Sequence, residues 1–496
     1  MSSSTGATSP PPTAQRESPL ARVALRFTAF TEKWLPDAFG FVLIGTLLIL
    51  LLGLVTGEPL LKAAADPKKL TGMGLVDAWG AGFWSLITFT LQMAMIIIGG
   101  YAVATSPPMS RLITALARIP RSPRSAVAFV AAVSMLASYF NWAFSLILGA
   151  ILAREVARVV RGTDYRAVGA MAFLGLGTVW AQGFSGSAAL QVASKSSSPP
   201  SVQQQIQKFG YADGILPLDH TILTWRAVAA TLMVFVVGVV MAWLLAPRGE
   251  GAKTAEELGI RLRPLVGPGS AHDEERSRAV KPRPGDWIEN SPIMTVLIVA
   301  IAAVWIVRAF ASAKNPVLAL DLNMVNLILL MLAMLLHWRP ARLAKAVGDG
   351  TRAASGVLLQ FPFYGGIFGM IAYTGLSHRI ADWLVGLSNQ FFFPPLIAFY
   401  SMVLGVFVPS GGSKWVIEAP YVLEAAHQLG VDPGWMVVVY DLGEASANLL
   451  QPFWMLPTLA VLGLKAKDIM GYTFAMFLAC FPVALIAVTI FAPHVG

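Results

Sequence analysis

The sequence has little charge and almost no cysteine. Of its 496 residues only 13% are charged, whereas 56% are apolar, and the mean hydropathy is +0.65. A soluble domain needs roughly 25% charged residues to cover its surface, so this composition excludes an ordinary soluble protein. The single cysteine, Cys480, excludes an intrachain disulfide and a cysteine metal site. The lipid bilayer is therefore the expected solvent and partner of the chain.

Signals of other protein classes are also missing. The six histidines are scattered without metal-ligand spacing, so we expect neither a metal nor a cofactor beyond a coupling Na⁺ or H⁺. No phosphate-binding loop is present, which argues against ATP-driven pumping. The net charge of +9 comes from basic residues between apolar runs, a pattern of cytoplasmic loops and not of nucleic-acid binding. No signal peptide is expected in residues 1–14.

Long apolar runs dominate what is present. A helix needs about 20 apolar residues to span the hydrocarbon core, whereas a membrane β-barrel shows short alternating segments. Uncharged runs of suitable length cover residues 38–57, 80–110, 125–153, 167–194, 227–247, 290–307, 322–336, 353–377, 383–413, 445–464 and 469–493. The predicted fold class is an all-α polytopic membrane protein.

The pattern of the first half of the chain recurs in the second half. An ungapped offset of 268 residues aligns residues 82–190 with 350–458, and interruptions of the apolar runs coincide. The loops that carry Lys and Arg place the start of the first copy outside and the start of the second in the cytoplasm, so the copies are predicted to be inverted. Inverted repeats with broken helices are typical of secondary transporters, whose substrate site lies between the repeats.

Four parts of the chain follow from this organisation. They are a disordered tail over 1–30, a first transmembrane half over 31–247, a charged cytoplasmic linker over 248–288 and a second transmembrane half over 289–496. Basic residues flank both ends of the run 125–153, which favours a re-entrant hairpin that turns near Asn141. Two short spans are the alternative, and the same choice stays open for 391–425.

The predicted substrate site consists of the interruptions. Irregular backbone at membrane depth leaves peptide groups unpaired unless they line a cavity, and half-helix N-termini favour an anion. Packing kinks are the alternative. Hydroxyls, small residues and neighbours at these positions are the predicted substrate-binding residues: Asn141, Ser145, Gly183, Phe184, Ser185, Gly186, Ser187, Pro409, Ser410, Gly411, Gly412, Ser413, Lys414 and Trp415.

A carboxylate in the second half is the predicted coupling site. Glu444, Asn448 and Gln451 have the spacing that places three side chains on one helix face, where they could hold a cation or a proton. A buried structural pair is the alternative. Lys414 and Glu418 could pair with each other, or Lys414 could meet the negative charge of a substrate.

Several motifs together resemble the bacterial short-chain fatty acid transporter family. They are VPSGG at 408–412, WVI at 415–417, GE at 443–444, QPFW at 451–454, NW at 141–142, REVAR at 154–158 and GFSGS at 183–187. The resemblance extends from about residue 30 to the C-terminus. It implies two inverted repeats, re-entrant hairpins, elevator-like movement and uptake of short monocarboxylates such as acetoacetate or butyrate with a cation, in the bacterial inner membrane.

We therefore predict a cation- or proton-coupled symporter and no enzyme, with the N-terminus in the cytoplasm and a homodimer left open. Apolar neighbours such as Phe184 and Phe453 would accept the alkyl tail. The alternatives are a carrier of dicarboxylates or other organic anions, which Lys414 would favour, a passive channel, and an intramembrane serine hydrolase. The hydrolase would use Ser185 as its nucleophile and would need a histidine within the membrane as its base. The candidate base, His220, lies at the end of a span.

Overall fold

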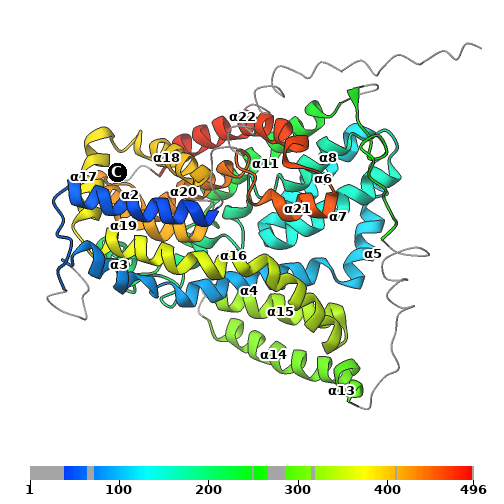
Figure 1. The fold of residues 1–496 in the computed structure, drawn as a ribbon, viewed down its shortest axis with the longest axis horizontal. Coiled ribbons are helices and arrows are strands. Elements are labelled where there is room, and N and C mark those ends of the chain that lie inside the picture. The colour runs from blue at the N-terminus through cyan, green and yellow to red at the C-terminus, as the bar shows by residue number, and fades with distance from the viewer. Residues whose placement is uncertain are drawn as a thin grey trace, which may run out of the picture.

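The computed structural model describes residues 38–63, 72–247, 251–265, 285–313, 319–407 and 410–493, and within these ranges the chain is helical and has no β-strand (Figure 1). Six helical segments are long and apolar enough to cross a membrane: Ile87–Ala104, Pro123–Phe140, Trp225–Leu245, Pro292–Ser312, Ala354–Ala372 and Ala466–Ile490. Shorter apolar helices cover Val42–Val55, Leu322–His337 and Phe393–Val406. The polytopic all-α prediction is confirmed. The predicted tail and Pro409 lie outside the described residues.

The first half of the chain contains both short and long helices. The helices are α2 (Ala38–Val55), α3 (Leu75–Phe83), α4 (Ile87–Ala104), α5 (Pro107–Leu116), α6 (Pro123–Phe140), α7 (Trp142–Val159), α8 (Tyr165–Phe173), η1 (Trp180–Gln182), α9 (Ser187–Val192), α10 (Pro200–Lys208), η2 (Leu218–His220) and α11 (Trp225–Leu245). The single predicted run 80–110 is therefore divided among α3, α4 and α5.

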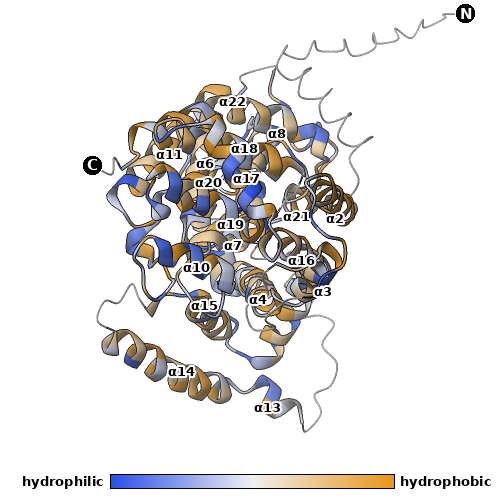
Figure 2. Cartoon of the chain, turned by 90° about the vertical axis from the view of Figure 1, so that its left-hand side faces the viewer, coloured by the Kyte–Doolittle hydropathy of each residue, from blue (hydrophilic) through white to orange (hydrophobic). Residues whose placement is uncertain are grey.

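The second half of the chain contains the helices α13 to α22. The helices are α13 (Asp286–Asn290), α14 (Pro292–Ser312), α15 (Leu322–His337), α16 (Pro340–Ala372), α17 (Leu376–Leu387), α18 (Phe393–Phe407), α19 (Gly411–Leu429), α20 (Pro433–Ala447), α21 (Met455–Leu462) and α22 (Ala466–Ile490). In Figure 2, α14 lies at the edge of the molecule, where it packs against α15, and is mostly hydrophobic. Only Thr295 of this helix is buried.

Helix boundaries recur at the spacing seen in the sequence. Helices α4 and α16 end at Ala104 and Ala372, and α8 and α20 begin at Tyr165 and Pro433. Helices α9 and α21 begin at Ser187 and Met455. Each pair is 268 residues apart, so the offset aligns helix ends as well as residue types.

Two turns explain why glycine and aspartate recur at this offset. Gly162 and Gly430 have positive φ values of 75° and 68°, a conformation that glycine adopts without a steric penalty. Two residues later, the carboxylates of Asp164 and Asp432 accept backbone N–H groups at the starts of α8 and α20, at 2.8 and 2.7 Å. These N-caps satisfy donors that the first helical turn leaves unpaired, and they fix where each helix begins.

A second pair of glycines permits close helix packing. A Cβ atom on Gly175 would lie 2.5 Å from the carbonyl oxygen of Ser134 in α6, and one on Gly443 would lie 2.2 Å from that of Ala398 in α18. Small residues allow helix backbones to approach within a membrane. Each hairpin thus packs against the segment that follows it through an equivalent glycine.

The two halves interleave around the interrupted segments. Helix α16 packs against α3 and α4, α21 packs against α7, and α19 packs against α9. Side-chain amides also cross between the halves, because Gln182 donates to the carbonyl of Val438 at 3.1 Å and Asn448 donates to that of Leu176 at 3.1 Å. The interrupted segments of both halves therefore meet in the centre of the protein.

Candidate functional site

The first interruption lies between α6 and α7, where the sequence predicts a turn. Asn141 has an extended backbone, and its Oδ1 accepts the N–H of Phe144 at 2.8 Å to cap α7. Helices α6 and α7 pack against each other, so this segment is a helical hairpin. The amide Nδ2 of Asn141 is buried and has no hydrogen-bond partner within the described part of the chain.

The second interruption, residues 183–187, is held against the first. The N–H of Phe184 donates to the carbonyl of Tyr139 at 2.8 Å, and the N–H of Trp142 donates to Oγ of Ser185 at 3.0 Å. A Cβ atom on Gly183 would lie 2.1 Å from the Tyr139 oxygen, so glycine is the residue that fits here. The two predicted breaks of the first half are thus joined by hydrogen bonds and close packing.

The third interruption brings the second half into contact with this unit. A Cβ atom on Gly411 would lie 2.7 Å from the ring of Trp180, and one on Gly412 would lie 3.0 Å from Cβ of Ser187. The hydroxyls of Ser410 and Ser413 form a hydrogen bond of 2.5 Å. Glycines at the start of α19 thus allow its first turn to lie against η1 and α9.

A small cavity opens where these three interruptions meet. Its volume is about 20 Å³, far below that of a typical small-molecule site, so the walls must move apart before a substrate can enter. Its lining comes from both halves and consists of Met93, Trp142, Leu176, Trp180, Ser187, Val357, Phe361, Ser410, Gly411, Gly412, Asn448 and Trp454. No residue in this lining carries a charge.

The chemistry of the lining suits a small molecule with one polar end. Rings and aliphatic side chains cover most of the wall, while two hydroxyls and one amide supply hydrogen bonds. The indole N–H groups of Trp142 and Trp180 are buried and have no acceptor among the described residues. An unpaired buried donor costs about 1–3 kcal/mol, so a bound acceptor such as a carboxylate oxygen would be stabilised here.

Only part of the predicted substrate-binding set lines this cavity. Ser187, Ser410, Gly411 and Gly412 do. The other described members of the set do not line the cavity, and we call them supporting residues: Asn141, Ser145, Gly183, Phe184, Ser185, Gly186, Ser413, Lys414 and Trp415.

Two of the supporting residues, Ser145 and Trp415, make contacts inside the protein. The hydroxyl of Ser145 donates to the carbonyl of Ser134 at 2.8 Å. Trp415 is fully buried beside Tyr440, with 4.8 Å between the ring centroids. Phe184 packs against Tyr139 and Phe140 and is absent from the lining, as is Phe453.

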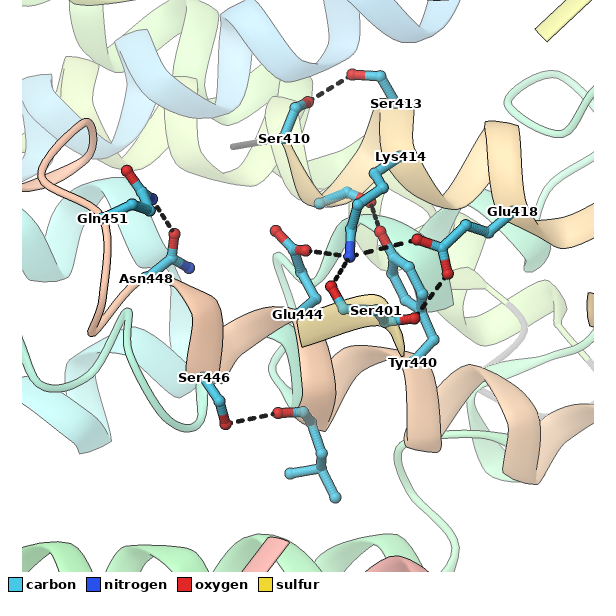
Figure 3. A network of polar contacts seen from close by, with 12 residues as sticks. Ser401, Ser410, Ser413, Lys414, Glu418, Tyr440, Glu444, Ser446, Asn448 and Gln451 are labelled. Atoms are coloured by element: carbon cyan, nitrogen blue, oxygen red, sulfur yellow. Dashed lines mark hydrogen bonds and ion pairs between the residues drawn. The ribbon is translucent and has the colours of Figure 1, made fainter. Parts of the chain in front are cut away.

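A charge centre lies where Lys414 and Glu418 of α19 meet Glu444 of α20 (Figure 3). We use this name for Lys414, Glu418, Asp441 and Glu444, each of which is at most 1% exposed. Nζ of Lys414 lies 2.5 Å from the carboxylate of Glu444 and 3.4 Å from that of Glu418. The predicted pairing of Lys414 with Glu418 is present, and Glu444 from another helix completes it.

The predicted helix face of Glu444, Asn448 and Gln451 is wrong. Helix α20 ends at Ala447, Asn448 is its C-cap, and the chain then turns before Pro452. Nε2 of Gln451 donates to Oδ1 of Asn448 at 2.8 Å, and Oε1 of Gln451 accepts the N–H of Phe453. The two amides therefore stabilise the fourth interruption, while Glu444 faces Lys414 (Figure 3).

The surroundings of Ser185 differ from those of a hydrolase nucleophile. Its oxygen is buried and accepts the backbone N–H of Trp142. His220, the candidate base, is exposed, and its Nδ1 lies 3.2 Å from the hydroxyl of Tyr211. Activation of a serine needs a base within hydrogen-bond reach, and His220 is engaged elsewhere.

Sequence reasoning missed Trp142 and Trp180 as lining residues. Trp142 directly follows the cap residue Asn141, and Trp180 lies two residues before Gln182 in an uncharged run. Their rings are 6.1 Å apart, and Trp142 is 5.1 Å from Trp454. A tryptophan next to a predicted break was the signal that could have identified these lining residues. At a break the large ring cannot pack along a continuous helix.

The arrangement defines a multi-pass membrane transporter fold. A crystal structure of the YdaH transporter of Alcanivorax borkumensis aligns with a TM-score of 0.57 at 18% identity, covering 92% of this chain and 97% of that one. The structure of MtrF from Neisseria gonorrhoeae, described among antimetabolite efflux pumps, aligns with a TM-score of 0.54 at 15% identity, covering 94% and 96%. At these identities the likeness concerns the fold.

Sequence similarity then identifies the family. Residues 19–491 match the family described as short chain fatty acid transporter. An Escherichia coli K12 protein named "Putative short-chain fatty acid transporter" is 33% identical over 95% of this chain and 100% of its own length. A Haemophilus influenzae protein of the same name is 31% identical over 94% and 99%. The chain belongs to the short-chain fatty acid transporter family, which is a family of transporters and not of enzymes.

Proposed function

We propose that the protein is a secondary active transporter that takes up short-chain fatty acids such as butyrate or acetoacetate together with a cation. The observation that carries this proposal is the uncharged cavity between the interruptions, with two unpaired indole N–H donors at Trp142 and Trp180. The donors suit a carboxylate, and the apolar wall suits a short alkyl tail.

The transport movement is part of the same proposal. The 268-residue recurrence of helix ends supports two repeats of inverted topology in the inner membrane, with the N-terminus and the linker in the cytoplasm. The hairpins α6–α7 and α18–α19 would move as re-entrant units against a scaffold, as in an elevator. A monocarboxylate fits better than a dicarboxylate, because Lys414 is fully buried against Glu444 and does not line the cavity.

Removing one indole donor tests the binding site. Trp180→Phe keeps a ring in the wall but removes the N–H, and a hydrogen bond to a charged group contributes about 1.5–3 kcal/mol, so KM for butyrate should rise at least about tenfold. Uptake of labelled butyrate into proteoliposomes, corrected for protein-free liposomes, measures this. Trp305→Phe in the exposed helix α14 is the matched control. An unchanged KM in Trp180→Phe would exclude the assigned donor.

Replacing Glu444 tests the coupling. The carboxylate is buried in contact with Lys414. The net charge that the carrier moves through the membrane when it returns without substrate therefore depends on whether Glu444 is protonated or ion-paired. Glu444→Gln should abolish accumulation of butyrate against its gradient and leave downhill exchange measurable. Glu155→Gln, which alters a buried carboxylate paired with Arg158 in α7, is the control. Accumulation by Glu444→Gln at the native level would remove Glu444 from the coupling mechanism.

A further inference from the structure

The ammonium group of Lys414 lies in a shell of oxygen atoms. Besides the two carboxylates, Nζ donates to the carbonyl oxygen of Ser401 at 2.5 Å, and it lies 4.7 Å from the ring centroid of Tyr440 (Figure 3). Carboxylate and backbone carbonyl oxygens are the ligands that hard cations prefer, and carbonyls of interrupted helices coordinate Na⁺ in transporters. The face of an aromatic ring adds attraction for a cation.

The surrounding helices are shaped to admit this group. Gly405 of α18 faces the charge centre, and a Cβ atom there would lie 2.7 Å from Oε2 of Glu444 and 3.5 Å from Nζ of Lys414. A side chain on α18 would therefore displace the ion pair. The shell and the space both fit a single monovalent cation, and the ammonium of Lys414 occupies that place.

We propose that Lys414 is a tethered cation that fills the coupling-cation site, so that the proton gradient and not a Na⁺ gradient drives uptake. This inference rests on the proposed function, since it names the coupling ion of the same carrier.

The charge centre contains more carboxyl groups than ammonium groups, so protons can bind to its carboxyl groups. Asp441 is the third carboxyl group; it interacts with Glu444 and Lys414, and its Oδ2 has no hydrogen-bond partner in the described ranges. Three buried carboxyl groups thus accompany one buried ammonium. A buried excess of negative charge is costly unless cations neutralise it, and a proton on a carboxyl group does so without displacing Lys414.

The other titratable groups around the centre are phenols, which carry no charge at neutral pH. They are Tyr364 of α16, Tyr400 of α18, Tyr421 of α19 and Tyr440 of α20, each of which lies near Glu418 or Glu444. None of them supplies a second positive charge. Protons on the carboxyl groups therefore remain the means by which the centre changes its charge during a transport cycle.

The charge centre and the cavity share the first turn of α19. The N–H of Lys414 donates to the carbonyl of Ser410 at 2.9 Å, and the hydroxyl of Tyr440 donates to the carbonyl of Gly411. Ser410 and Gly411 line the cavity. A change in the protonation of the centre is thus only one helical turn from the place where substrate would bind, which is the proximity that coupling needs.

The test compares ion gradients in proteoliposomes that contain the intact chain. For the native protein, an inward proton gradient should accelerate uptake of labelled butyrate above the rate in protein-free liposomes, which accounts for diffusion of the neutral acid. An inward Na⁺ gradient at equal pH should have no effect. In Lys414→Ala, which vacates the shell, external Na⁺ should stimulate uptake about tenfold relative to choline.

A binding measurement accompanies the transport assay. Because a ligand that binds the folded state stabilises it, Na⁺ should raise the Tm of Lys414→Ala in detergent and leave the native Tm unchanged. Lys414→Met is the matched control, since its side chain still fills the space, and it should gain neither effect. Na⁺-driven uptake by the native protein, or a folded Lys414→Ala without a Na⁺ response, would overturn the inference. Absence of any protein-dependent butyrate uptake would instead contradict the proposed function.

Discussion

Lys414→Met is expected to lower the free energy of unfolding by about 3–5 kcal/mol, because breaking a buried ion pair leaves an uncompensated charge. Its ammonium is fully buried between Glu444 and Glu418, so neither carboxylate gains access to water when it is removed. Chemical denaturation in detergent micelles measures the loss. Although buried charges are costly to form, the large effect arises from leaving one half of the pair behind.

A double variant separates charge from packing in this prediction. Lys414→Met/Glu444→Gln removes both charges and should recover at least about 1 kcal/mol of the loss, since contacting residues are coupled by roughly 0.5–3 kcal/mol. Lys195→Met is the control, because Lys195 pairs with Asp213 on the surface and both side chains are exposed. A loss in Lys414→Met no larger than that in Lys195→Met would contradict a stabilising charge centre.

Gly183→Ala is expected to abolish most transport activity and to cost about 1–3 kcal/mol of stability, which is typical of overpacking. The new Cβ would lie 2.1 Å from the carbonyl oxygen of Tyr139, and backbone of a packed hairpin cannot move aside as a flexible side chain would. The displaced segment carries Ser187, which lines the cavity. Butyrate uptake and thermal melting are the measurements.

A glycine without neighbours provides the comparison for Gly183. Gly348 of α16 has no atom within 4 Å of a Cβ built on it, so Gly348→Ala should leave both uptake and stability near the native values. The same change in side-chain size is thus made at a packed and at an open site. Native uptake by Gly183→Ala would show that the contact between the first two interruptions does not position the cavity.

The positions of the interruptions were predictable because each carries a residue that an apolar helix does not favour. Asn141 in the middle of a 29-residue run predicts a cap, and the structure has one there. The glycine and serine content of 183–187 likewise predicts a break, and α9 begins at Ser187. The repeat offset was visible for a related reason, because Gly162 and Gly430 are required by equivalent left-handed turns.

The contacts between side chains of separate helices could not be read from the sequence. Glu444 meets Lys414 from a separate helix, and no periodicity within one element reports such a pairing. The spacing of Glu444 and Gln451 wrongly predicted that both lie on one helix face, because α20 ends at Ala447, before Gln451. The division of the run 80–110 into three helices also escaped prediction, since the turn after Phe83 carries a single polar residue, Ser85, within an otherwise apolar run.

The exposure of α14 has a consequence for how its sequence can change. Thr295 is its one buried side chain, so almost every position along this helix has few protein neighbours that would constrain the shape of an apolar side chain. Leucine, isoleucine, valine and phenylalanine should therefore interchange freely there. The helix is the natural place to attach a spectroscopic label, because a reporter on it would sense the membrane while leaving the packed interior undisturbed.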